Sequence, residues 1–277
     1  MTGATDPGKA DMADDAVAAE ARLLDQAERS AHQIRPTTQV HPRATMNDGY
    51  RIQAAWLDLK LRRGERLIGH KIGLTSRAMQ EAMGITTPDS GFVTEAMVFQ
   101  PDSVLAADRF CDPKLELELA FVLSDDLGGL DLGIDDVLDA TAEIRPAVEI
   151  IAARSFRRDP DTGRPRTVVD TIADNAANAG IVCGGTAVGP RDIDPRWVSA
   201  LGYRNDVIEE TGVAAGVLDH PANGIVWLAR RYHQHGLGLR AGQIILAGSF
   251  TRPIDVRAGD RFRFDFGPLG AFGLDFD

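Results

Sequence analysis

The chain has 277 residues, 44% of them hydrophobic and 26% charged, which is typical of a globular protein with one large domain or one domain and a smaller partner. Its formal net charge of −11 argues against nucleic acid and anionic membranes as main partners, because both attract clustered lysine and arginine. No stretch approaches the length of a membrane span, and the N-terminus lacks a signal-peptide core. The two cysteines, Cys111 and Cys183, have neither metal-ligand nor disulfide spacing, so we expect a cytoplasmic protein.

Helical periodicity marks the N-terminal part of the chain. Residues 1–14 are small and polar and are expected to be a disordered tail. Apolar residues then recur at three- and four-residue steps, first from Val17 to Ala31 and again from Tyr50 to Leu61. The sequence therefore predicts a small helical layer over residues 15–66, followed by a catalytic domain over residues 67–277.

A short apolar strand with one lysine opens the second part. Lys71 lies among apolar and glycine neighbours, which fits either a lysine at a strand edge with its head group in solvent or a lysine that holds an anion or transfers a proton. His70 should point to the opposite side of this strand. Residues 87–91 have the composition of a turn, and Asp89 could simply shape it.

Leucine and glutamate alternate over residues 114–123, which predicts a strand. Glu116 and Glu118 would share one face, with their attachment points about 7 Å apart. This face is either a solvated acidic surface or half of a cation site.

Glu149 is the one charge in the apolar middle of a predicted buried strand at 144–153. A buried carboxylate needs a cation, an arginine or a proton. Arg145 and Arg154 are the local candidates for a salt bridge, and metal ligation is the alternative.

Short strands and turns dominate the rest of the chain. Residues 155–170 form a basic loop that is either solvated or able to hold a dianionic substrate. A hairpin around Asn205-Asp206, a helix at 222–233, and strands at 244–251, 261–266 and 272–276 follow. Together these elements predict an α+β fold, rich in β, with a rolled mixed sheet.

Most familiar catalytic motifs are missing from the sequence. There is no dinucleotide-binding glycine pattern, Walker loop or nucleophile elbow, and His220, His233 and His235 are weak candidates for zinc. Three carboxylates remain: Glu116, Glu118 and Glu149. Oxygen ligands without histidine or cysteine favour Mg²⁺ or Mn²⁺, which would act as a Lewis acid on a bidentate 2-oxo acid or its enol.

Several stretches resemble the fumarylacetoacetate hydrolase superfamily, and within it the group of hydratases and decarboxylases. The resemblance covers roughly residues 20–277 and implies the rolled mixed sheet of that superfamily's C-terminal domain. The matching segments are Gly69–Ser76, Leu115–Leu123, Asp174–Gly180, Tyr203–Asn205, Ile208–Leu218, His220–Gly224 and Gly248–Pro253.

The resemblance also implies roles for single residues. Glu116, Glu118 and Glu149 would hold Mg²⁺ or Mn²⁺, and Lys71 and Asp89 would carry proton transfer. Weaker candidates are Ser249 and Thr251 for hydrogen bonds to the substrate, and Arg166 and Arg252 for a distal carboxylate.

The implied reaction is the addition of water to 2-oxo-hept-4-ene-1,7-dioate, or to its 2-hydroxydienoate tautomer, in the meta-cleavage catabolism of homoprotocatechuate. The product would be 4-hydroxy-2-oxoheptane-1,7-dioate, and the enzyme would be a homo-oligomer. Four alternatives stay open. They are decarboxylation of a 2-oxo dioate such as 4-oxalocrotonate, hydration of 2-hydroxypenta-2,4-dienoate, hydrolysis of a carbon–carbon bond in an acylpyruvate, and a non-catalytic partner that supports another enzyme.

Overall fold

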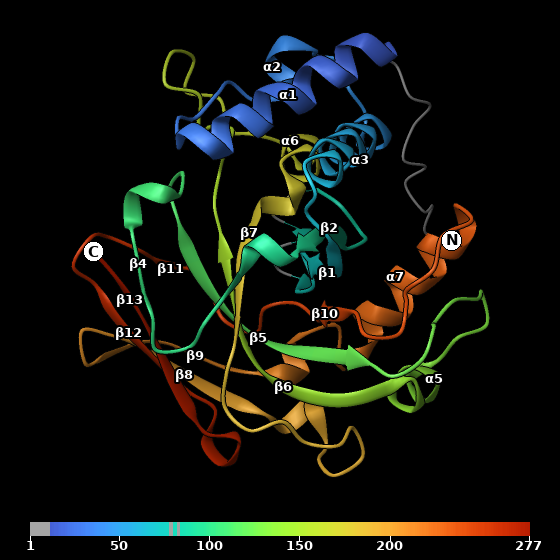
Figure 1. Cartoon of the computed structure of the whole chain (residues 1–277), viewed down its shortest axis with the longest axis vertical. Coiled ribbons are helices and arrows are strands. Elements are labelled where there is room, and N and C mark those ends of the chain that lie inside the picture. The colour runs from blue at the N-terminus through green and yellow to red at the C-terminus, as the bar shows by residue number, and fades with distance from the viewer. Residues whose placement is uncertain (1–11, 78–79, 82–83) are drawn as a thin grey trace.

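Two curved β-sheets form most of the molecule (Figure 1). The computed structural model describes residues 12–77, 80–81 and 84–277. The larger, eight-stranded sheet has the order β2-β1-β10-β5-β6-β7-β3, with β11 also paired to β5. The second sheet has five strands in the order β4-β13-β12-β8-β9.

Strands β5 and β6 are the longest and form the centre of the large sheet. The large sheet contains β1 (Leu67–Gly73), β2 (Asp89–Thr94), β3 (Val98–Phe99), β5 (Lys114–Leu123), β6 (Thr141–Ile151), β7 (Asn178–Cys183), β10 (Ile244–Leu246) and β11 (Ile254–Asp255). The second sheet contains β4 (Val104–Leu105), β8 (Ser199–Arg204), β9 (Val207–Val213), β12 (Arg261–Asp265) and β13 (Ala271–Phe276).

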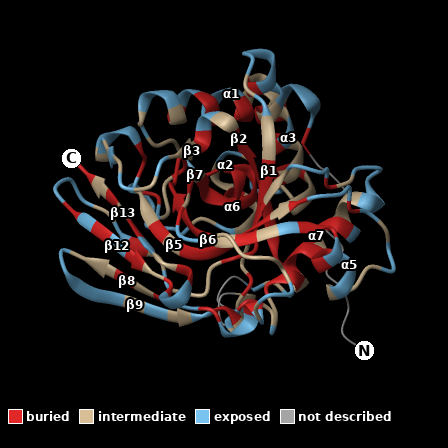
Figure 2. Cartoon of the chain, turned by 60° about the horizontal axis from the view of Figure 1, so that its bottom comes forward, coloured by how far each residue is buried: buried red, intermediate tan, exposed pale blue. Residues whose placement is uncertain are grey.

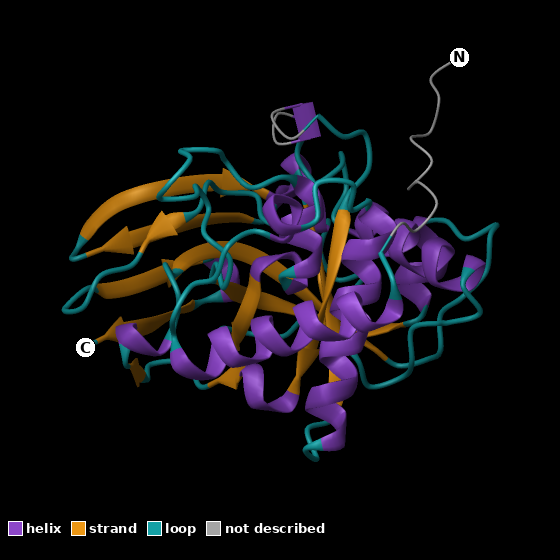
Figure 3. Cartoon of the chain, turned by 90° about the horizontal axis from the view of Figure 1, so that it is seen from above, coloured by secondary structure: helices purple, strands orange, loops and turns teal. Residues whose placement is uncertain are grey.

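One face of the large sheet is covered by the N-terminal helices α1 (Asp14–Ser30) and α3 (Met46–Arg62), and the short helix α2 (Thr37–Val40) packs against α6 (Val168–Ala173). Helix α3 begins at a capping box in which Thr45 and Asp48 satisfy each other's backbone N–H groups. Apolar residues of α1 and α3, such as Leu24 and Trp56, pack in one core with residues of the sheet. Figure 3, viewed from above, shows these helices crossing the strands.

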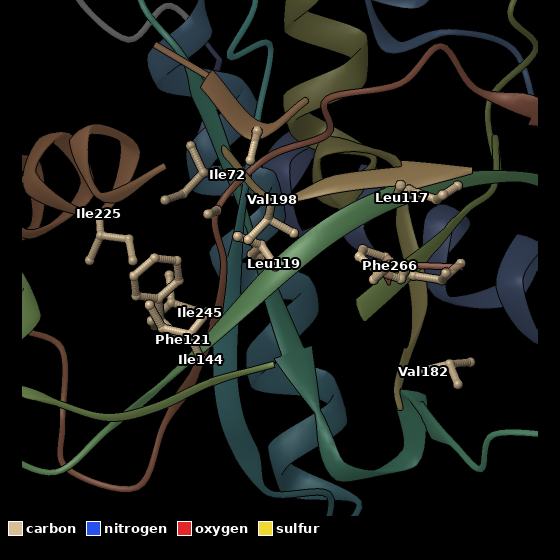
Figure 4. Packing of buried hydrophobic residues seen from close by; sticks show 14 of the residues in the cluster. Ile72, Leu117, Leu119, Phe121, Ile144, Val182, Val198, Ile225, Ile245 and Phe266 are labelled. Atoms are coloured by element: carbon tan, nitrogen blue, oxygen red, sulfur yellow. The ribbon is translucent and has the colours of Figure 1, made fainter. Parts of the chain in front are cut away.

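The opposite face of the large sheet packs against the second sheet and α7 (Ala222–Gln234). Leu117, Leu119 and Phe121 of β5 belong to this core, and Figure 4 shows Ile225 of α7 beside Phe121 and Ile245. The colours of Figure 2 show β5 and β6 largely buried and β9 largely exposed. A further α-helix is α5 (Ile134–Asp139).

The α+β fold with a rolled mixed sheet, predicted from the sequence, is confirmed. Two local predictions are wrong. Residues 89–91 are not part of a turn, because β2 begins at Asp89 and pairs with Gly73 of β1. The strand predicted over 244–251 ends at Leu246, shortly before Gly248, whose φ of +114° turns the chain away from the sheet.

The N-terminal boundaries are close to those expected. Helix α1 begins at Asp14 and Met12 is buried, whereas residues 1–11, most of the expected tail, lie outside the described residues. The sequence also predicts a short helix over residues 77–83, and part of that range lies outside the described residues. The division into a helical layer and a catalytic domain at residue 66 stays a prediction. No helix in the described part of the chain is both long and apolar enough to span a bilayer.

Candidate metal centre

Three glutamates meet on the face of the large sheet that the N-terminal helices cover. Glu116 and Glu118 lie two residues apart on β5, so both point to the same side. Glu149 on β6 lies directly opposite Glu116 in the antiparallel register. One carboxylate oxygen from each of the three lies within 4.8 Å of the others, so strand pairing brings the three glutamates together.

The protein satisfies only part of the hydrogen-bonding capacity of these carboxylates. Glu118 and Glu149 are fully buried, and Glu116 is half-buried. The backbone N–H of Gly248 donates to Glu118 Oε2 (2.8 Å), and the Asn178 amide donates to Glu149 Oε1 (2.7 Å). The other oxygens of Glu118 and Glu149 have no hydrogen-bond partner among the described residues. Buried carboxylate oxygens without a hydrogen-bond partner are suitable ligands for a hard divalent cation such as Mg²⁺, Mn²⁺ or Ca²⁺.

The electrostatics of the cluster also fit a cation. Burial, reinforced by the nearby charge of Glu149, raises the pKa of Glu116 to about 7. The same two causes raise the pKa of Glu118 well above its ordinary value. The site without a cation therefore disfavours the ionised forms of both carboxyl groups, and a bound cation would favour them.

Lys71 of β1 is the nearest cation. Its ammonium lies 3.4 Å from Glu149 Oε1, and the side chain is 4% exposed, so the interpretation of Lys71 as a solvent-directed lysine is wrong. Burial lowers the pKa of Lys71, but the carboxylates of Glu149, Asp89 and Glu116 outweigh it, and the net shift is upward. Lys71 is therefore a protonated, buried cation at neutral pH.

The side chain of Asp89, the first residue of β2, lies close to the Lys71 ammonium. Its partner in the β1–β2 register is Gly73, two residues after Lys71 on the same face. A Cβ atom at Gly73 would lie 2.3 Å from Asp89 Oδ1 and 2.9 Å from Lys71 Nζ, so both charged ends converge over this glycine. Burial raises the pKa of Asp89 to about 6, although Lys71 opposes the shift.

A cavity of about 590 Å³ opens beside this cluster, and Glu116 forms part of its wall. Ser249, Thr251 and Arg252 also line it. The Ser249 hydroxyl donates to the Thr251 carbonyl (2.9 Å), and Thr251 Oγ1 accepts a hydrogen bond from the backbone N–H of Leu117 (3.2 Å). Arg252 is 84% exposed, and its guanidinium lies 2.9 Å from Glu210.

Arg166 acts on the site through its charge, which opposes the rise in the pKa of Asp89. Its side chain is largely buried, lies 3.3 Å from Asp174 and does not line this cavity. Asp174 also pairs with Arg154 (2.6 Å), whereas Arg145 pairs with Glu143 (2.5 Å). Neither of the two arginines considered as salt-bridge partners of Glu149 therefore takes that role.

The three histidines named as zinc candidates do not belong to the glutamate cluster. The His220 ring nitrogen Nδ1 accepts a hydrogen bond from the backbone N–H of Ala222 at the start of α7. Within the described residues, His233 and His235 belong to no cluster that could hold a metal. Cys183, an apolar position of β7 that the sequence predicts to be in the core, is half-buried.

The sequence does not identify Asn178 as a site residue. Its side-chain amide nevertheless donates a hydrogen bond to Glu149, a candidate metal ligand. The three residues before it, Asn175, Ala176 and Ala177, all have left-handed backbone angles (φ 55°, 48° and 65°), which are unfavourable for residues other than glycine. Asn175 stabilises this turn through hydrogen bonds to both the N–H and the carbonyl of Phe92. The only hint in the sequence is the run of asparagine and alanine before the strand.

Comparison with known proteins places this geometry in a family, although no protein-family model matches the chain. The 2-oxo-hept-4-ene-1,7-dioate hydratase of Escherichia coli is 51% identical over 256 residues, which is 92% of this chain and 96% of that protein. The 2-hydroxyhexa-2,4-dienoate hydratase of Comamonas testosteroni is 33% identical over 259 residues, covering 93% of this chain and 96% of that protein.

Among solved structures, 4-oxalocrotonate decarboxylase from Pseudomonas putida G7, complexed with magnesium and adipate, superposes with a TM-score of 0.92 at 28% identity. The superposition covers 97% of this chain and 100% of that structure. The identity and the extent of these matches confirm the resemblance stated from the sequence. The chain belongs to the fumarylacetoacetate hydrolase superfamily and, within it, to the group of hydratases and decarboxylases.

Proposed function

We propose that the chain is a metal-dependent hydratase that adds water to 2-oxo-hept-4-ene-1,7-dioate and produces 4-hydroxy-2-oxoheptane-1,7-dioate. The observation that carries the proposal is the convergence of three carboxylates, two of them fully buried, with Lys71 and Asp89 beside one cavity. The 51% identity to a hydratase of that name supports the choice of substrate. We further propose Mg²⁺ or Mn²⁺ as the ion, on the basis of the all-oxygen donor set.

The proposed reaction shifts a proton within the substrate and then adds one molecule of water. When bound at the three glutamates, a divalent ion supplies a Lewis acid for the C1 carboxylate and the C2 oxygen of the substrate. A proton leaves C3 and another arrives at C5, which creates a C3–C4 double bond conjugated with the C2 oxo group. Water then adds at C4 and a proton returns to C3, so the substrate gains one water and no electrons.

Asp89 and Lys71 are proposed to divide the proton chemistry. With a pKa raised to about 6, the Asp89 carboxyl can accept and return a proton near neutral pH. Lys71 keeps its proton, so its charge can stabilise negative charge that develops on the substrate.

The test is a spectroscopic assay with 2-oxo-hept-4-ene-1,7-dioate in which the product is identified by mass spectrometry. We expect conversion that stops when EDTA removes the metal and returns when Mg²⁺ or Mn²⁺ is added. Turnover of equal rate in EDTA would contradict the metal's role. The same assay with the five-carbon substrate 2-hydroxypenta-2,4-dienoate tests the choice of a dioate.

Decarboxylation of a 2-oxo dioate is a second candidate, because the structure with a TM-score of 0.92 is that of a 4-oxalocrotonate decarboxylase. Both reactions need the same metal-assisted stabilisation of negative charge on the C2 oxygen. Release of carbon dioxide from 4-oxalocrotonate, without formation of a 4-hydroxy product, would favour this alternative.

We also propose that the enzyme is a homo-oligomer. Strand β9 is an edge strand of the second sheet and exposes Val207, Ile208 and Val213, and Trp197 nearby in sequence is 69% exposed. Exposed apolar edges of this kind favour association between chains. Light scattering of the purified protein would measure the number of subunits, and a monomer would contradict the proposal.

A further inference from the structure

A second cavity lies between helices α3 and α7, at the β1–β2 edge of the large sheet. Its volume is about 540 Å³, and it shares no lining residue with the cavity beside the metal centre. His70 and Phe92, which are paired across β1 and β2, reach it from the sheet. Because side chains alternate along a strand, this cavity lies on the opposite side of β1 from Lys71.

The charged side chains that line this second cavity are all arginines. Arg51, Arg231 and Arg240 line it, whereas none of its described lining residues is an aspartate or a glutamate. This bias is unusual in a chain with a formal net charge of −11. His70 adds no charge, because burial lowers its pKa to about 4 and its Nδ1 is hydrogen-bonded to the Tyr232 hydroxyl (2.9 Å).

Arg231 differs from the other two arginines. Arg51 and Arg240 each form ion pairs with aspartates outside the cavity lining. Arg231 stacks over the Tyr50 ring at 4.0 Å, and no described residue forms an ion pair with it or accepts a hydrogen bond from it. Stacking covers the face of a guanidinium but leaves the N–H donors at its edge free for a planar anion.

The rest of the wall is largely apolar. Leu57, Leu67, Phe92 and Leu237 contribute side chains, so the cavity combines the guanidinium of Arg231, which has no ion pair with a described residue, with hydrocarbon and aromatic surface. Small-molecule sites in proteins combine these two features. We propose that this cavity is an accessory binding site for a small amphipathic anion, an aromatic carboxylate, whose carboxylate pairs with Arg231 and whose ring packs on the apolar wall.

The test is isothermal titration calorimetry of the full chain with phenylacetate, compared with the neutral phenylacetamide, in buffer that contains EDTA. We expect one phenylacetate per chain and binding of the amide weaker by roughly tenfold, because the amide lacks the charge that Arg231 recognises. Arg231→Gln should weaken phenylacetate binding by roughly tenfold, and Arg231→Lys by less. The matched control is Arg230→Gln, an exposed arginine on the same helix that does not line the cavity and should bind as the wild type does.

Two further variants separate this cavity from the metal centre and from a folding defect. Ala54→Trp places a large side chain at an exposed lining position, so it should block binding without disturbing the core. Glu118→Gln alters the metal centre and should leave binding unchanged. Absence of binding by the wild type, equal binding of acid and amide, unchanged binding by Arg231→Gln in a folded protein, or loss of binding in Glu118→Gln would each overturn the proposal.

Discussion

Glu149 faces Glu116 directly across the β5–β6 pair, and this contact between like charges is the central electrostatic feature of the molecule. Like charges opposite each other in a sheet are unfavourable unless another group neutralises them. Glu118 and Asp89 add two more buried acids, whereas Lys71 is the one buried cation that contacts the cluster among the described residues. The protein therefore holds a deficit of positive charge that a divalent ion would correct.

Metal affinity should depend on pH because the metal-free site holds protons. The pKa of Glu116 is raised to about 7, and that of Glu118 is raised as well, so protons must leave when a cation binds. We expect the apparent affinity for Mn²⁺ to fall as the pH is lowered from 8 to 6, by up to about tenfold per unit for each displaced proton. Calorimetry in buffers of different ionisation enthalpy would detect the released protons. Affinity that stays constant across this range would contradict the raised pKa values.

Glu118→Gln should change stability in opposite directions with and without metal. A carboxyl group whose pKa is raised in the folded state costs stability as the pH rises above its ordinary pKa in the unfolded chain, and the full cost is present above the raised pKa. Glutamine can still accept the Gly248 hydrogen bond but carries no charge. At pH 8 we expect a higher thermal midpoint than the wild type in EDTA and a lower one in excess Mn²⁺.

These shifts should amount to a few degrees, since about 1 kcal/mol moves the midpoint of a chain of this size by roughly 2 °C. The matched control is Glu143→Gln on β6, whose carboxylate pairs with Arg145 and lies outside the cluster. It should show no dependence on metal beyond that of the wild type. A Glu118→Gln variant stabilised by metal as much as the wild type would remove Glu118 from the site.

Gly73→Ala should damage catalysis without unfolding the protein. The new methyl group would lie 2.3 Å from Asp89 Oδ1 and 2.9 Å from Lys71 Nζ, so both side chains must move. A displacement of about 1 Å in a catalytic group can cost roughly 100-fold in rate, and we expect a loss of kcat of that order. Gly216→Ala is the control, because Gly216 lines the same cavity and a Cβ there meets nothing within 4 Å. Equal activity of the two variants would contradict the assigned geometry.

Asn178→Ala should weaken metal binding more than it weakens the fold. The Asn178 amide orients Glu149 through a 2.7 Å hydrogen bond, and loss of such a partner of a metal ligand typically costs roughly 10- to 100-fold in affinity. Binding of Mn²⁺ can be followed by electron paramagnetic resonance, with the thermal midpoint in EDTA as the measure of folding. Asn223→Ala, which removes an amide that donates to the Leu218 carbonyl, is the control. Unchanged Mn²⁺ affinity in Asn178→Ala would show that Glu149 needs no such support.

The metal-ligand candidates could be predicted from the sequence because their positions depend on local rules. The period of two along a strand places Glu116 and Glu118 on one side, and a lone carboxylate in an apolar strand identifies Glu149. The residues around Asp89 have the composition of a turn, which wrongly predicts a turn there. Pairing of β2 with β1 overrides that local preference.

Gly73 and Asn178 could not be found in this way. The importance of Gly73 depends on the register of β1 with β2, and that of Asn178 on the register of β6 with β7. Register joins segments far apart in the chain, and a left-handed turn such as 175–177 has no sequence signal when alanines occupy it. Residues that support a site from neighbouring strands therefore become visible only in the structure.

We predict that Arg252 sets the preference of the cavity for a dioate. Its exposed guanidinium lies at the cavity wall and pairs with Glu210 at 2.9 Å, so a second carboxylate on the substrate could compete for it. We expect Arg252→Gln to raise KM for 2-oxo-hept-4-ene-1,7-dioate by roughly tenfold, the typical value of one charge-assisted hydrogen bond, with little change in kcat. For a monocarboxylate substrate of similar length, neither constant should change. Arg263→Gln, which removes another exposed, ion-paired arginine, is the control. A dioate-specific loss in Arg166→Gln instead would assign the distal carboxylate to the buried arginine beside Asp174.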